Sequence, residues 1–105
     1  MMLNTKLDKG DWVDYEDGVK FLIRPFPASQ MMITTKEEEY MNQAVKMFKY
    51  CVVDWEGLED EETGKPVPCN DKMKQYIFDH IPEIRDFVTE AVSKRMVKED
   101  EESKN

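Results

Sequence analysis

Long apolar runs are missing from this chain of 105 residues, and so is any apolar stretch at its N-terminus. A membrane-spanning helix needs ~20 consecutive apolar residues, and a signal peptide needs a shorter apolar core. We therefore expect a cytoplasmic protein with no membrane association. In that compartment its two cysteines are expected to be reduced thiols.

Soft metal ligands are equally scarce, because Cys51, Cys69 and His80 are all that the sequence offers. They lack the closely spaced pairs from which structural zinc sites are usually built. No motif places a cysteine beside the histidine, and the four glycines are too isolated for a phosphate-binding loop. The sequence predicts no metal, no cofactor and no enzymatic activity.

Basic residues are in deficit, with 15 Lys and Arg against 23 Asp and Glu, for a net charge of -8. Such a chain repels a phosphate backbone, so we expect no nucleic acid as a partner and favour a basic protein. Six acids and no base lie between residues 54 and 62. Their order does not match the register of a calcium-binding loop, so they predict a solvated acidic loop.

Among the signals that are present, the first is a β-hairpin near the N-terminus. Asp17-Gly18 separates two β-rich runs at 12–15 and 19–24, and Asp-Gly suits the tight turn of a hairpin. Two prolines then end the second strand, because neither can donate to a ladder. Residues 28–34 fit either a short helical turn or an extended connector.

Helical signals follow the hairpin. Thr35 and Glu38 have the spacing of a capping box at a helix start, and Asn70 is placed to cap a second helix. Pro82 suits the first turn of a third. The predicted helices span 36–52, 71–80 and 82–97.

The order of these elements predicts an α+β fold, with an N-terminal β-hairpin packed on about three α-helices. We expect Trp55-Glu56-Gly57 to end the first helical element. The predicted single domain covers residues 1–97, and an acidic disordered tail covers 98–105.

Partner binding is predicted for large apolar residues on and just after the first helix. Eight methionines are many for this length, and methionine-rich faces adapt to varied apolar partners. The same residues also have to build the core, and Trp55 in particular fits a core position. The face with Ile77, Ile84 and Val88 competes as a binding face. The candidate partner-binding residues are Tyr40, Met47, Phe48 and Trp55.

The region from residue 47 to 92 resembles the small tail assembly chaperones of long-tailed bacteriophages. The resemblance rests on VVDWEGL at 52–58, ETGKPVPCN at 62–70 and IPEI at 81–84, in that order and at that spacing. The strand that ends in IRP at 23–25 is also similar to the N-terminal part of that family.

The resemblance implies a phage or prophage protein without enzymatic activity. Members of the family bind the tape measure protein and help tail tube subunits to assemble around it, so the implied partners are the tape measure protein and the tail tube protein. Many are also made in a longer, frameshifted form, which an amino-acid sequence cannot reveal.

Two further hypotheses come from the residues alone. The acids of 54–62 and the small size suggest a small acidic inhibitor that mimics nucleic acid and acts on a basic host protein, although the interspersed bases argue against it. The exposed hairpin edge at residues 11–15 suggests self-association by strand pairing.

Overall fold

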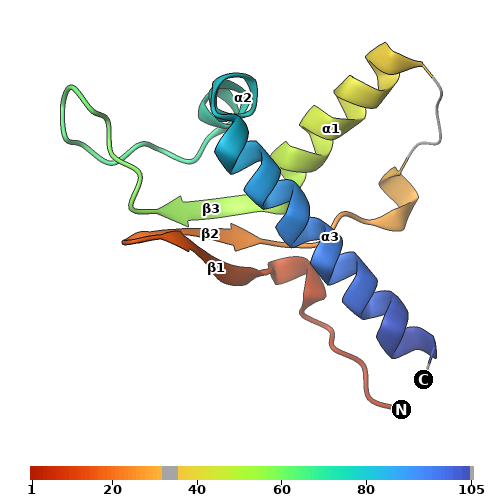
Figure 1. The fold of residues 1–105 in the computed structure, drawn as a ribbon. Coiled ribbons are helices and arrows are strands. Elements are labelled where there is room, and N and C mark those ends of the chain that lie inside the picture. Colours follow the sequence, from red (N-terminus) through yellow and green to blue (C-terminus); the bar gives the residue numbers. More distant parts are fainter. Residues whose placement is uncertain (32–35, 105) are drawn as a thin grey trace.

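The chain builds its sheet from two separate parts of the sequence and covers it with helices. The computed structural model describes residues 1–31 and 36–104, with side chains up to Met96, and this described chain contains three strands and three α-helices. The strands lie in the order β1-β2-β3, with α3 running across the sheet and α1 and α2 above it (Figure 1). This confirms the predicted α+β domain with an N-terminal hairpin.

The hairpin forms where the Asp-Gly turn predicts it. After a short 3₁₀ turn, η1 (Leu7–Lys9), strand β1 (Asp11–Glu16) pairs antiparallel with β2 (Val19–Ile23). Val13 lies opposite Phe21, and both side chains face the helices. Strand β1 is an outer strand of the sheet, as the self-association hypothesis requires.

The segment after the first helix corrects the sequence prediction. We expected a helix to about residue 52 and a stop at residues 55–57, but α1 (Glu37–Cys51) passes directly into strand β3 (Val52–Glu56). β3 pairs antiparallel with β2 and places Trp55 opposite Phe21. The open edge of β2 supplies hydrogen-bond partners to the backbone groups of residues 52–56. These residues therefore form a strand instead of continuing the helix.

The start of α1 is only partly covered by the structure. The predicted capping residue Thr35 lies outside the described residues, and Lys36 occupies the N-cap position without a side-chain cap hydrogen bond. Earlier in the chain, η2 (Ala28–Gln30) shows that the ambiguous segment begins as a short helical turn. Residues 32–34 of that segment are likewise outside the described residues.

Helix α2 (Asp71–His80) has the predicted bounds and the predicted cap. The Oδ1 atom of Asn70 accepts a hydrogen bond of 2.8 Å from the backbone N–H of Met73. This bond satisfies one of the free N–H groups of the first turn. The helix therefore begins where the sequence indicates.

Helix α3 (Pro82–Lys104) begins at the predicted proline and extends beyond the expected end near residue 97. The side chains from residue 97 onward lie outside the described part. The division into a domain at 1–97 and an acidic tail at 98–105 therefore stays a prediction.

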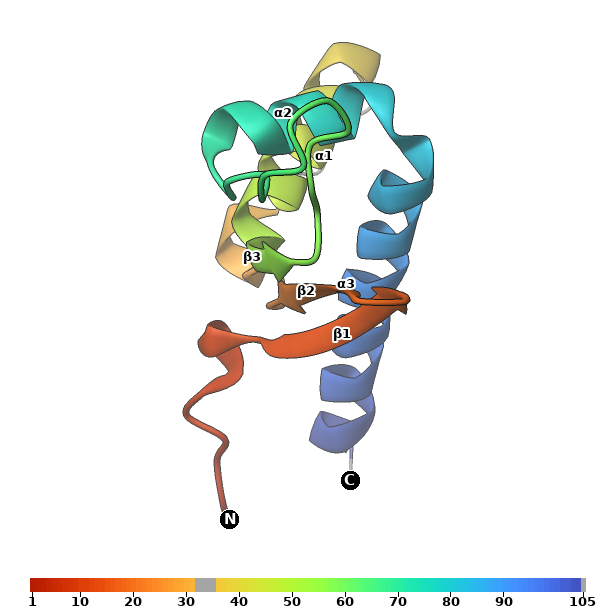
Figure 2. The same ribbon diagram turned by 90° about the vertical axis from the view of Figure 1, so that its left-hand side faces the viewer.

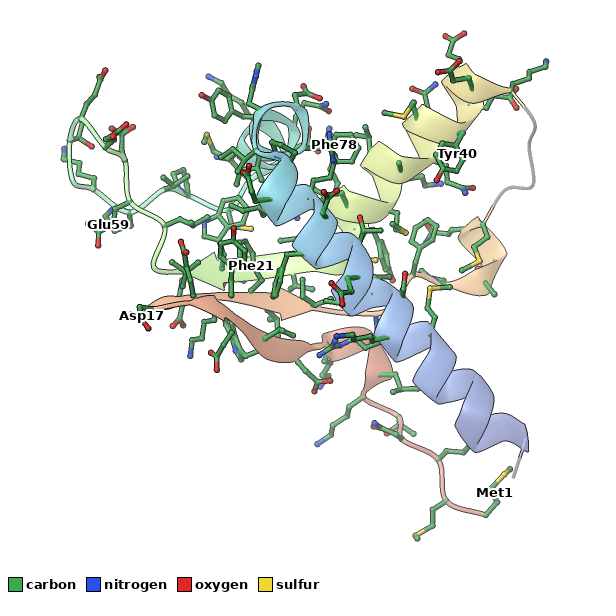
Figure 3. All side chains as sticks on the ribbon, in the orientation of Figure 1. Met1, Asp17, Phe21, Tyr40, Glu59 and Phe78 are labelled. Atoms are coloured by element: carbon green, nitrogen blue, oxygen red, sulfur yellow. The ribbon has the colours of Figure 1, made fainter. Side chains whose placement is uncertain are left out.

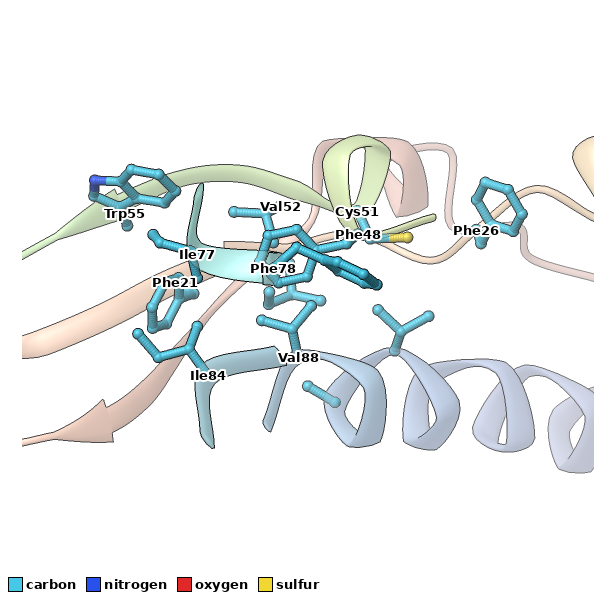
Figure 4. Packing of buried hydrophobic residues seen from close by; sticks show 13 residues of the cluster. Phe21, Phe26, Phe48, Cys51, Val52, Trp55, Ile77, Phe78, Ile84 and Val88 are labelled. Carbon is cyan, nitrogen blue, oxygen red and sulfur yellow. The ribbon is translucent and has the colours of Figure 1, made fainter. Parts of the chain in front are cut away.

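The core lies between the inner face of the sheet and the helices (Figure 4). Phe21 meets Trp55 edge-on at a centroid distance of 6.2 Å, and Phe48 meets Phe78 at 5.6 Å. Such edge-to-face pairs add to the gain from burying the rings. The buried apolar residues are Phe21, Ile23, Phe26, Phe48, Cys51, Val52, Trp55, Ile77, Phe78, Ile84, Val88, Ala91 and Val92.

Candidate partner-binding surface

The segment between β3 and α2 closes back on itself as a loop. The backbone N–H of Val67 donates to the carbonyl oxygen of Leu58 at 2.8 Å, and that of Asp60 donates to Lys65, also at 2.8 Å. The indole Nε1 of Trp55 donates to the carbonyl oxygen of Val67 at 2.8 Å. The first two bonds join the two sides of the loop, and the third ties its returning side to β3, so the loop projects in a defined direction.

Gly57 sets the direction in which the loop leaves the sheet. Its backbone φ is +89°, and a Cβ atom there would collide with the carbonyl oxygen of Gly18 in the hairpin turn. Glycine adopts this conformation without steric cost and permits this close approach. The predicted turn at Gly57 is present, but it ends a strand instead of a helix.

The acids of the loop divide into one structural residue and several free ones. The Oδ1 atom of Asp60 accepts the backbone N–H groups of Glu62 at 2.8 Å and Thr63 at 3.1 Å, which fixes the turn. Glu59, Glu61 and Glu62 are exposed, and no ion pair in the described part of the chain includes them. Figure 3 shows Glu59 on the projecting loop. The loop therefore presents carboxylates that pair with no cation among the described side chains.

A groove of about 580 Å³ opens between this loop, α2 and the beginning of α3. In Figure 2 the loop stands in front of α2, with α3 descending beside both. The acids of residues 59–62 border the groove, and so does Tyr76 of α2, whose side chain is 53% exposed. We name it the acid-rimmed groove. Its apolar lining consists of Leu58, Val67, Met73, Ile77, Ile81 and Ile84.

The predicted partner-binding residues are separated by the fold. Phe48 is 2% exposed and Trp55 is 6% exposed, so both belong to the core and present no surface to a partner. Met47 is half-buried, and Tyr40 is 62% exposed on the projecting half of α1 (Figure 3). Of the four residues, only Tyr40 and Met47 keep accessible surface.

The competing face on α2 and α3 is also used by the core. Ile77, Ile84 and Val88 are at most 5% exposed, because they pack against the sheet and α1. Ile77 and Ile84 still form the floor of the acid-rimmed groove. A partner in the groove would therefore contact the outer side of the core.

Sequence reasoning missed the accessible residues of the groove. Leu58, Met73 and Ile81 are half-buried, and each packs on the core while bordering the groove. One signal was available: Leu58 is an apolar residue directly before the acid run, and Ile81 directly precedes Pro82. Neither belongs to a periodic helix face, so periodicity alone could not select them.

A second hollow, of about 530 Å³, lies beside α1 and is bordered by Arg24, Lys46 and Lys49. The Arg24 guanidinium lies 3.7 Å from the centre of the Tyr50 ring, and its Nε donates to the Tyr50 carbonyl oxygen at 2.8 Å. Lys49 pairs with Asp71 at 3.2 Å. Two of these three cations therefore already have partners within the chain.

The cysteines lie in environments that suppress ionisation. Burial raises the pKa of the Cys51 thiol to about 12, although the nearby Arg24 acts in the opposite direction. Burial also raises the pKa of Cys69, whose Sγ donates to the Val53 carbonyl oxygen at 3.8 Å. Both thiols stay protonated near neutral pH, which makes them poor nucleophiles. The His80 ring, for its part, packs against the Tyr76 ring at a centroid distance of 4.7 Å.

The described residues contain neither a cluster of metal-ligating side chains nor a helix fit to span a membrane. Within them, no three side chains of the His, Cys, Asp and Glu types gather closely enough to hold a metal ion. Among the described helices, none combines the length and apolar character that crossing a bilayer requires.

Comparison of the chain with protein families, with curated proteins and with solved structures found no match. What the structure defines is a class: a small α+β domain in which helices cover a three-stranded antiparallel sheet over the described residues, with an acid-rimmed apolar groove beside its projecting loop.

Proposed function

We propose that this protein is a non-enzymatic tail assembly chaperone of a bacteriophage or prophage. In this role it binds the tape measure protein, keeps it in solution and assists the assembly of the tail tube around it. It acts in the cytoplasm of the bacterial host. The tail tube protein is a second partner of the same process.

The observation that carries the proposal is that the segments resembling the family form one structural unit. Trp55, Gly57 and Asn70 hold β3, the acidic loop and α2 together through the indole hydrogen bond, the glycine turn and the helix cap. The Pro82 segment begins α3 beside them. This unit encloses the acid-rimmed groove, so the shared pattern supports a surface suited to binding.

The physical properties of the surface fit this task. A tape measure protein is long and helical, and its apolar stripes are exposed until the tube covers them. An apolar groove can shield such a stripe for a time, because helices commonly bind by laying their apolar face into a groove. The net charge of -8 helps to keep the resulting complex in solution.

Co-expression tests the proposal directly. A gene for a very long helical protein is expected near genes for a tail tube protein in the same neighbourhood. We expect this long protein to stay soluble when co-expressed with the present chain, to aggregate without it, and to co-purify with it. Unchanged solubility in both cultures would overturn the proposal, and the acidic-inhibitor hypothesis would then explain the loop better.

A further inference from the structure

We infer that the acid-rimmed groove is the docking site for an amphipathic helix whose apolar face is flanked by lysine or arginine. The inference rests on the proposed function for the source of the helix, which would be a segment of the tape measure protein. The location and the chemistry of the site come from the described side chains.

The apolar part of the groove is suited to a helix face. Leu58, Met73 and Ile81 are half-buried and line the groove above a floor that includes Ile77 and Ile84. These side chains already pack on the core, so the surface exists before the partner arrives. A preformed surface lowers the cost of binding, because few of its groups have to be ordered.

The rim defines the charge of the partner. Glu59, Glu61 and Glu62 border the apolar lining, and none of them takes part in an ion pair within the described part of the chain. A helix with flanking lysine or arginine would neutralise these carboxylates. A helix with flanking acids would be repelled, so the rim selects between partners of equal apolar character.

Two other exposed surfaces fit such a helix less well. The hollow beside α1 is bordered by Arg24, Lys46 and Lys49, which would repel a basic helix. Tyr40 and Met41 are exposed on α1, and acids precede them, but neither lines a described hollow. The α1 surface is therefore the natural comparison in an experiment.

The probe is a synthetic peptide of about 18 residues with a leucine stripe flanked by lysines, labelled with fluorescein. A second peptide has the same stripe flanked by glutamates. Fluorescence anisotropy measures binding of each peptide to the full chain at low and high salt. We expect the lysine peptide to bind, binding to weaken as salt rises, and the glutamate peptide to bind at least about tenfold more weakly.

Matched variants locate the site. Glu61→Gln with Glu62→Gln removes two groove carboxylates, while Glu37→Gln with Glu38→Gln removes two carboxylates from α1 and changes the net charge equally. All four residues are exposed, so both double variants should fold. We expect about a tenfold loss of lysine-peptide affinity in the groove variant and less than about a twofold change in the α1 variant.

Tyr76→Ala and Tyr40→Ala extend the comparison to the apolar contacts, because both rings are more than half exposed. Circular dichroism confirms that each variant is folded. Weaker binding in Tyr76→Ala alone supports docking in the groove. Equal losses in the groove and α1 variants, a loss confined to the α1 variants, or no binding of the lysine peptide would each overturn the inference.

Failure of this inference differs from failure of the proposed function. If the groove variants still keep the long helical neighbour soluble and the α1 variants do not, the chaperone function stands and the docking site is wrong. If the lysine peptide binds in the groove but the neighbour never depends on the protein, the docking site stands and the function is wrong.

Discussion

The indole Nε1 of Trp55 donates a hydrogen bond of 2.8 Å to the carbonyl oxygen of Val67, twelve residues further along the chain. The bond joins the last part of β3 to the returning end of the acidic loop. Trp55 is also packed edge-on against Phe21 of the neighbouring strand. One side chain thus connects the sheet, the core and the loop that borders the groove.

Trp55→Phe removes this hydrogen bond and keeps an aromatic ring in the core. The Val67 carbonyl then loses its indole partner, so we expect the free energy of unfolding to fall by about 1–2 kcal/mol. Urea denaturation followed by circular dichroism measures the change. Trp12→Phe is the control, because Trp12 is 42% exposed, and it should change stability by less than about 0.5 kcal/mol. Equal losses in the two variants would contradict the prediction.

Gly57→Ala should be far more damaging than Gly64→Ala. Both glycines have positive φ, +89° at Gly57 and +71° at Gly64, so both variants carry a backbone cost of about 1–2 kcal/mol. Only at Gly57 would the added Cβ also collide with the Gly18 carbonyl oxygen, since nothing lies within 4 Å at Gly64. Thermal unfolding of both variants tests this, and similar melting temperatures would refute it.

Asn70→Ala should destabilise the first turn of α2 and lower the free energy of unfolding. The side chain accepts the Met73 N–H at 2.8 Å, and loss of such a cap costs about 1 kcal/mol. Asn42→Ala is the matched control, because Asn42 is exposed within α1 and alanine favours a helix interior. Chemical denaturation of both variants gives the comparison. A loss in Asn42→Ala as large as in Asn70→Ala would show that the cap contributes nothing.

Because the Cys51 thiol is buried, we predict that the folded state loses stability at alkaline pH. The pKa of this thiol rises from 9.0 to about 12 on folding, so both states are protonated below pH 9 and no stability is lost there. Between these values the unfolded thiol ionises and the folded thiol does not, so stability falls with rising pH by up to about 1.4 kcal/mol per unit.

Cys51→Val tests this prediction, because valine fills similar space and does not titrate. The difference in unfolding free energy between the natural chain and the variant should stay constant below pH 9. Above it, the natural chain should lose stability faster. Parallel curves for the two proteins across the alkaline range would contradict the burial of a neutral thiol.

Elements defined by neighbouring residues were predictable from the sequence. The Asp17-Gly18 turn, the Asn70 cap and the Pro82 helix start appear where expected. Each depends on backbone preferences or on a side chain bonding a backbone group a few residues away. Strand β3 was missed because its residues follow a helix directly and take their hydrogen bonds from β2, far earlier in the chain.

The candidate surface was less predictable than the fold. A periodic apolar pattern shows that a helix has an inner face, but it does not show how far along the helix the rest of the protein covers that face. Phe48 and Tyr40 are both predicted partner-binding residues of α1, yet Phe48 is buried and packs on Phe78 of α2, whereas Tyr40 is exposed on the projecting half of α1 (Figure 3).

The sequence by itself determined the class of the domain, the hairpin, the bounds of α2, the acidity of the loop and the scarcity of metal ligands, because these depend on composition or on local backbone chemistry. Only the tertiary structure decided that residues 52–56 form a strand, that Trp55 lies in the core and that Leu58 and Ile81 line the same groove as the loop carboxylates. Those outcomes depend on contacts between distant segments, and such contacts exist only once the chain has folded.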